Sequence, residues 1–342
     1  MRDAKAPAFR LVGGLTVLNV AAWGWAVAMF HDRPSLMGTA LLAYGFGLRH
    51  AVDADHIAAI DNVTRKLLQQ GERSLSTGLW FALGHSTVVV LAALAIAATT
   101  AEMAAHFEAL RAVGVVVGTL VSTSFLLLIG LFNLGLLTRL WQALRRVRAG
   151  GAPPPVDHDL LTHGGGVMSR LLRGLFRLVR RPWHMLPLGF LFGLGFDTAS
   201  EVALMGVSAT QAQQGLPLWS ILVFPALFTA GMSLIDATDG VLMTGAYRWA
   251  FLRPVRRLYY NITITAMSVV VALLIGLVEG LGLIGDQLAL EGWFWDGIGA
   301  LNDNFSGLGF AIIGAFALTW LGAAVLYRWL RLDRLDLPAA NL

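Results

Sequence analysis

The sequence predicts an all-α membrane protein in which eight helices cross the bilayer. Of its 342 residues, 56% are hydrophobic and only 13% are charged, against about 25% charged residues in a soluble domain. Mostly apolar stretches recur along the whole chain, and each has the roughly 20 residues that cross a hydrocarbon core of about 30 Å. The eight predicted spans are 9–29, 36–62, 77–100, 112–138, 184–209, 217–245, 258–284 and 307–330.

The positions of Lys and Arg predict the orientation of these spans, because positively charged loops stay on the cytoplasmic side. With the N-terminus inside, the cytoplasmic segments carry 22 of the 25 basic residues, and the outer loops carry only Arg33 and Arg111. The remaining basic residue, Arg49, falls within the second predicted span. We therefore expect a multi-pass protein with both termini in the cytoplasm. The net charge of +4 follows from this topology and indicates contact with anionic membrane lipid, with no nucleic acid as partner.

The first predicted span is expected to be a retained helix, because its apolar stretch is longer than the core of a signal peptide. The segment 141–182 combines runs of Gly and Pro with many Arg, which is typical of a flexible basic linker. It divides the chain into 1–140, with spans 1–4, and 183–342, with spans 5–8. The outer segment 286–306 places three consecutive aromatic residues among acids, which predicts an interfacial stretch.

A weak internal repeat relates the two halves of the chain. Shifts of 146 or 147 residues pair Gly47 with Gly193, Asp55 with Glu201, Phe81 with Phe228, Gly84 with Gly231 and Ser86 with Ser233. Because span 2 runs inward and span 5 runs outward, spans 2–4 and 5–7 would be repeats of inverted topology, although chance similarity between Gly-rich helices is the alternative. In transporters, such an arrangement places the substrate site at the repeat interface near the midplane.

Four polar clusters lie inside predicted spans, where each Arg or Asp at the bilayer centre costs about 2.5–3.5 kcal/mol. Their members are Arg49, His50, Asp53, Asp55 and His56 in span 2, His85 in span 3, Asp197 and Glu201 in span 5, and Asp236 and Asp239 in span 6. The chain has no cysteine, so any metal site must use nitrogen and oxygen ligands. Imidazole with carboxylate suits Ni²⁺, Co²⁺, Zn²⁺ or Mn²⁺.

The spacing within span 2 conflicts with a straight helix. At about 100° per residue, His50 and His56 lie roughly 120° apart around a helix axis, so they do not face one ion. Either the helix is distorted there, or only some of these residues coordinate. Gly45 and Gly47 just upstream would permit a distortion.

The other clusters also leave structural alternatives open. His85 by itself can be a hydrogen-bonded packing residue. Asp197 and Glu201, four residues apart on one helical face, can hold a cation or pair with Arg49. Asp236 and Asp239 can neutralise basic loop residues.

These clusters are where the chain resembles the nickel/cobalt transporter family of single-component, high-affinity permeases. Residues 49–57 match the family signature Arg-His-Ala-Val/Phe-Asp-Ala-Asp-His-Ile, and residues 83–89 match Leu-Gly-His-Ser-Thr-Val-Val. The stretches 194–202 and 231–240 are similar to the third and fourth family motifs, with mild departures at Ser200 and Ala237, where Thr is expected.

The resemblance implies an eight-helix secondary transporter that imports Ni²⁺ and/or Co²⁺ across a prokaryotic cytoplasmic (inner) membrane. The ion is its substrate, and no resident cofactor or obligatory ATPase partner is expected. His50, Asp55 and His56 are implied to be essential for uptake, and we expect the metal ligands to be His50, Asp55, His56 and His85. The expected supporting or path-lining residues are Arg49, Asp53, Asp197, Glu201, Asp236 and Asp239.

Two alternatives compete with this hypothesis. The spacing His50-x4-Asp55 also fits membrane-bound acyltransferases, in which the His is a general base oriented by the acid. That reading would make the chain an enzyme, which we do not expect. The chain can also be the metal-binding subunit of a larger, ATP-driven importer, although it lacks a Walker A loop because neither Lys5 nor Lys66 lies in a Gly-Lys-Ser/Thr sequence.

Overall fold

The protein is all-helical, as the sequence predicts. The computed structural model describes residues 5–72, 74–98, 101–148, 179–195, 199–250 and 254–329, and no β-strand occurs among them. The helices are α1 (Lys5–Phe30), α2 (Pro34–His50), α3 (Ala54–Gln69), α4 (Thr77–Ala98), α5 (Ala101–Arg148), α7 (Met185–Gly193), α8 (Ala199–Gln213), α9 (Leu218–Ile221), α10 (Val223–Ala250), α11 (Pro254–Gln287), α12 (Trp293–Asp303) and α13 (Phe305–Trp329). A short 3-10 helix, Pro182–His184, precedes α7.

Five helices among the described residues are long and apolar enough to cross a membrane by themselves. They are Phe9–Phe30, Thr77–Ala97, Ala112–Arg146, Leu218–Gly245 and Ile262–Gln287. The bent pair α12 and α13, which meet at 76°, adds a sixth candidate. The predicted spans 36–62 and 184–209 are not among these candidates, because each is broken into two shorter helices. The structure is therefore that of a multi-pass membrane protein.

The break in the first of these two segments lies between α2 and α3. Asp53 is in an extended conformation, with φ −63° and ψ 146°, so it ends the helical hydrogen-bond ladder and starts α3 as its N-cap residue. Its side chain makes no capping hydrogen bond, although capping is the usual role of Asp at this position. Of the two alternatives for span 2, the distorted helix is the one observed. The break falls after His50 and not at Gly45 or Gly47.

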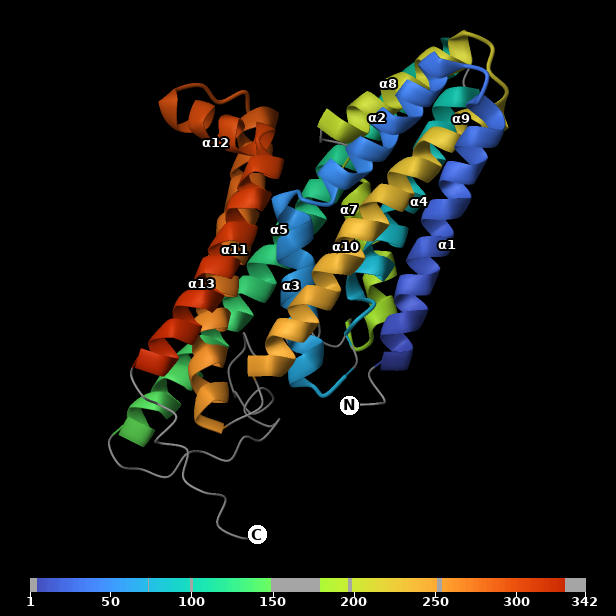
Figure 1. The fold of residues 1–342 in the computed structure, drawn as a ribbon. Helices are drawn as coiled ribbons and strands as arrows, with labels where there is room; N and C mark the ends of the chain where they lie inside the picture. The colour runs from blue at the N-terminus through green and yellow to red at the C-terminus, as the bar shows by residue number, and fades with distance from the viewer. Residues whose placement is uncertain are drawn as a thin grey trace.

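Two groups of helices flank α3 (Figure 1). It packs against α10 on one side and against α11 and α13 on the other. Close packing of α2 on α10 and of α7 on α4 depends on glycine, because Gly47 lies against the carbonyl of Phe228 and Gly84 against the carbonyl of Leu186. The first residue of α1 and the last residue of α13 lie at the same end of the molecule.

Gly47→Ala is expected to destabilise the protein. A Cβ at this position would collide with the backbone carbonyl of Phe228, and forcing extra volume into packed helices costs about 1–3 kcal/mol. Thermal unfolding of the detergent-purified protein measures the effect. Gly45→Ala is the matched control, since its Cβ meets nothing within 4 Å. Equal unfolding temperatures for the two variants would contradict this account of the α2 and α10 contact.

Arg65 and Lys66, two of the 22 basic residues counted in the cytoplasmic segments, are buried in the last turns of α3. Arg65 is 1% exposed and donates to Thr265 Oγ1 at 3.0 Å, which joins α3 to α11. Lys66 donates to the carbonyl of Val179 at 2.8 Å. Helix α3 continues beyond both residues to Gln69. The predicted linker 141–182 begins as a continuation of α5, and most of it, 149–178, lies outside the described residues.

Candidate metal centre

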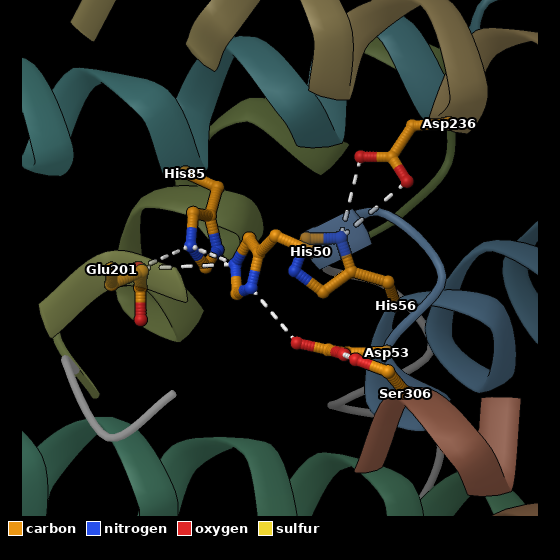
Figure 2. A network of polar contacts seen from close by, with 7 residues as sticks. All are labelled: His50, Asp53, His56, His85, Glu201, Asp236 and Ser306. Carbon is orange, nitrogen blue, oxygen red and sulfur yellow. Dashed lines mark hydrogen bonds and ion pairs between the residues drawn. The ribbon is translucent and has the colours of Figure 1, made fainter. Parts of the chain in front are cut away.

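Three buried histidines from three helices converge at the break between α2 and α3 (Figure 2). His50 ends α2, His56 lies in the first turn of α3, and His85 lies in α4. One ring nitrogen from each lies within 4.8 Å of the other two. His50 Nε2 and His85 Nε2 are 2.9 Å apart. The ring centroid of His56 is 4.7 Å from that of His50 and 4.8 Å from that of His85.

The local structure explains this convergence. The turn at 51–53 changes the direction of the chain, so His56 joins His50 although six residues of straight helix would have separated their faces. His85 of α4 faces the same point, and the neighbouring Gly84 allows α7 to pack closely on α4. The meeting of His50 and His56 therefore depends on the broken helix.

A carboxylate from α8 lies beside the three histidines. Glu201 Oε1 is 2.9 Å from His85 Nε2 and 3.8 Å from His50 Nε2, and its side chain is 1% exposed. It lies in the first turn of α8. Arg49 is exposed, so the structure brings Glu201 to the imidazoles and not to the buried pairing with Arg49 that was one alternative. Asp197, the other acid of that cluster, lies outside the described residues.

Two further carboxylates orient the imidazole rings. His50 Nδ1 donates to Asp53 Oδ2 at 2.9 Å, which leaves Nε2 of the neutral ring with a lone pair. His56 Nδ1 lies 3.3 Å from Asp236 Oδ2 and 3.4 Å from Oδ1. Among the described residues, His56 Nε2 is buried without a hydrogen-bond partner. Carboxylates at the second ring nitrogen are the usual support of histidines that ligate metals.

The spacing of these atoms suits a dication with several ligands. Two ligand atoms that are each about 2.1 Å from an ion and at right angles lie about 3.0 Å apart. The separations of 2.9 Å from His85 Nε2 to His50 Nε2 and to Glu201 Oε1 agree with this value. Imidazole and carboxylate ligands without sulfur suit first-row transition-metal dications such as Ni²⁺ and Co²⁺.

Other residues singled out in the sequence lie beside this group. Asp55 is a half-buried residue in the first turn of α3 and is not in the histidine group, and its Oδ1 is without a hydrogen-bond partner among the described residues. Asp239 lies one turn beyond Asp236 on α10. Sequence reasoning missed Ser306 of α13, which donates to Asp53 Oδ1. A single Ser in an apolar helix carries no signal that would have identified it.

Long apolar helices around a buried group of imidazoles and a carboxylate define a multi-pass membrane protein of the transporter class. The model of the high-affinity nickel-transport protein family matches residues 36–326. The chain belongs to this family.

Curated relatives match over nearly the whole chain. The chain is 55% identical to the high-affinity nickel transport protein of Cupriavidus necator over 95% of its own length and 93% of the relative's. It is 40% identical to the high-affinity nickel-transport protein NixA of Helicobacter pylori, over 92% and 95%. It is also 40% identical to the cobalt transport protein NhlF of Rhodococcus rhodochrous, over 92% and 90%. No solved structure matches.

These comparisons confirm the resemblance seen in the motifs. The family and its named members are transport proteins, so the chain is a transport protein and not an enzyme. The acyltransferase alternative finds no support. In addition, the acid that orients His50 is Asp53 and not Asp55, on which that alternative depended.

Proposed function

We propose that the chain is a secondary transporter that imports Ni²⁺ and/or Co²⁺ across the cytoplasmic membrane. The observation that carries this proposal is the convergence of His50, His56, His85 and Glu201 at one buried point. The ion exchanges water for imidazole and carboxylate there. The names of the relatives, which include nickel transport proteins and a cobalt transport protein, support this choice of substrate.

We further propose that the chain crosses the membrane eight times, with inverted repeats of spans 2–4 and 5–7. Both broken segments support this. Their second halves, α3 and α8, begin at Ala54 and Ala199, and the separation of these two residues differs by one from the 146-residue shift. Each second half begins with an acid in its first turn, Asp55 in α3 and Glu201 in α8. Helix ends that face a midplane site are typical of inverted-repeat transporters. The start of α1 and the end of α13 lie at the same end of the molecule, which supports the proposal that both termini are on one side of the membrane, the cytoplasmic side.

The route inward follows α10 in this proposal. Asp236 contacts His56, and Asp239 lies one turn nearer the end where the termini are assigned. Asp239 Oδ2 is buried without a hydrogen-bond partner among the described residues. Carboxylates spaced one helical turn apart offer a dication successive oxygen ligands after it leaves the imidazoles.

The test of this function is uptake by the purified chain alone in liposomes. We expect wild-type protein to accumulate radiolabelled nickel inside the vesicles when an inward-directed ion gradient is applied, and an excess of Co²⁺ to compete. Protein-free liposomes give the background. Uptake that requires an added ATPase and ATP would instead support the binding subunit of a larger importer. If the purified protein neither accumulates nor binds nickel or cobalt, the proposed function is wrong.

A further inference from the structure

The N-terminal end of α13 contacts the turn that separates α2 from α3. Ser306 Oγ donates to Asp53 Oδ1, and Gly309 lies so close to the carbonyl oxygen of Val52 that a Cβ would collide with it. Phe305 and Leu308 of α13 pack in the same apolar cluster as Val52. A hydrogen bond, a close backbone contact and an apolar cluster therefore hold this helix end against the turn at 51–53.

The contact matters because of what Asp53 does with its other oxygen. Asp53 Oδ2 accepts from His50 Nδ1 at 2.9 Å, while Oδ1 accepts from Ser306 (Figure 2). Asp53, His50 and Ser306 are all buried. Since Asp53 does not cap its own helix, its carboxylate is available to link α13 to the ring of His50.

His50 is the ring whose orientation has most effect on the site. Its Nε2 is 2.9 Å from His85 Nε2 and 3.8 Å from Glu201 Oε1. A rotation of the ring would move this nitrogen away from both. The ring is held at Nδ1 by Asp53, and Asp53 is in turn held by a helix that lies outside spans 2–7.

We propose that Ser306 is a positioning residue for the metal site. Helix α13 acts on the site through two hydrogen bonds, from Ser306 to Asp53 and from His50 to Asp53. The inference rests on the proposed function, because it assigns Ser306 a part in the binding of the same ion. It also gives the C-terminal helix a role in the site. Partners of metal-ligating histidines typically contribute about 10–100-fold to metal affinity.

Binding of Co²⁺ to the purified full-length protein in detergent tests the proposal without relying on transport. The visible absorption of bound Co²⁺ reports its ligand geometry, and a titration gives the dissociation constant. We expect Ser306→Ala to weaken binding about tenfold, the lower end of the range for such partners, and to change the spectrum. Ser306→Thr keeps the hydroxyl and is expected to restore both. Ser208→Ala is the matched control, because it removes a buried hydroxyl whose hydrogen-bond partner within the described part of the chain is the carbonyl of Leu204 in the same helix.

A double-mutant cycle separates positioning from packing. In an Asp53→Ala background Ser306 has no carboxylate to hold, so Ser306→Ala is expected to add nothing further to the dissociation constant. An equal, additive loss in both backgrounds would mean that Ser306 acts through the packing of α13 alone, and would overturn the inference. Where Ser306→Ala does not fold, Ser306→Cys, of similar size and with a weak donor, is expected to show the same weakening.

The outcomes distinguish this inference from the function on which it rests. Wild-type protein that binds no Co²⁺ overturns the proposed function. Wild-type protein that binds Co²⁺ tightly, together with a Ser306→Ala variant that has the same dissociation constant and spectrum, overturns only the role of Ser306.

Discussion

Replacing His50 by alanine is expected to abolish nickel and cobalt uptake. The substitution removes the proposed ligand atom Nε2, which lies 2.9 Å from His85 Nε2 and 3.8 Å from Glu201 Oε1. It also leaves Asp53 Oδ2 without the donor it has at 2.9 Å. Because loss of a supporting partner alone costs about 10–100-fold, the loss of a ligand together with that partner should exceed this range. Initial rates of radiolabelled nickel uptake into cells that express the variant measure the effect.

The control for this experiment is His31→Ala. His31 is exposed and pairs only with the neighbouring Asp32 at 2.9 Å, so the variant should transport like wild type. Immunoblots of membrane fractions establish that both variants reach the membrane at equal levels. Wild-type uptake by His50→Ala at equal levels would show that the three imidazoles are not the binding site.

Glu201→Gln is expected to raise the KM for uptake at least about 10²-fold. Two unit charges 4 Å apart attract by about 4 kcal/mol at an effective dielectric of about 20, and desolvation offsets only part of this attraction. The substitution preserves the shape of the side chain and removes its negative charge. Glu201 Oε1 is 2.9 Å from His85 Nε2, so its charge is at the point where the dication is expected to bind. Concentration series of nickel uptake, with the number of transporters normalised, give KM separately from the maximal rate.

Glu279→Gln provides the matched control for charge removal. Glu279 is also a buried membrane carboxylate, but its oxygens accept from Ser122 at 2.9 and 2.7 Å, between α11 and α5. A glutamine oxygen can accept the same hydrogen bond, so uptake should be unchanged. If both substitutions raised KM equally, the effect of Glu201 would be a general cost of altering a buried acid and not a sign of direct binding.

Much of the site follows from local sequence. Charges inside apolar stretches are costly, and this cost identified the clusters that contain His50, His56, Glu201 and Asp236. His85 stands alone in span 3 and was identified by the match of residues 83–89 to a family motif. The spacing of His50 and His56 does not fit one ion on a straight helix. It therefore also showed that either the helix is distorted or only some of these residues coordinate the ion. The position of the break was not predictable, because it depends on Asp53, whose carboxylate bonds to His50 just before the break and to Ser306 of the distant helix α13.

Contacts between distant segments set the remaining features. Arg49 is adjacent to His50 in the sequence yet exposed, whereas Arg65, counted in a cytoplasmic segment, is buried against α11. A helical pattern states which residues share a face but not which neighbour that face meets. The choice between Arg49 and the imidazoles as partners of Glu201 therefore required the packed structure.

The sequence by itself determined that this is an all-α membrane protein and which side chains are available to bind a transition metal. Both conclusions depend on hydropathy and residue chemistry, which are local properties. The tertiary structure decided that three imidazoles and Glu201 meet at one point, and that Ser306 supports them from 253 residues away along the chain from Asp53. Such a meeting depends on how helices pack, and helix packing is decided by close contacts such as that of Gly47 with Phe228, which no local pattern specifies.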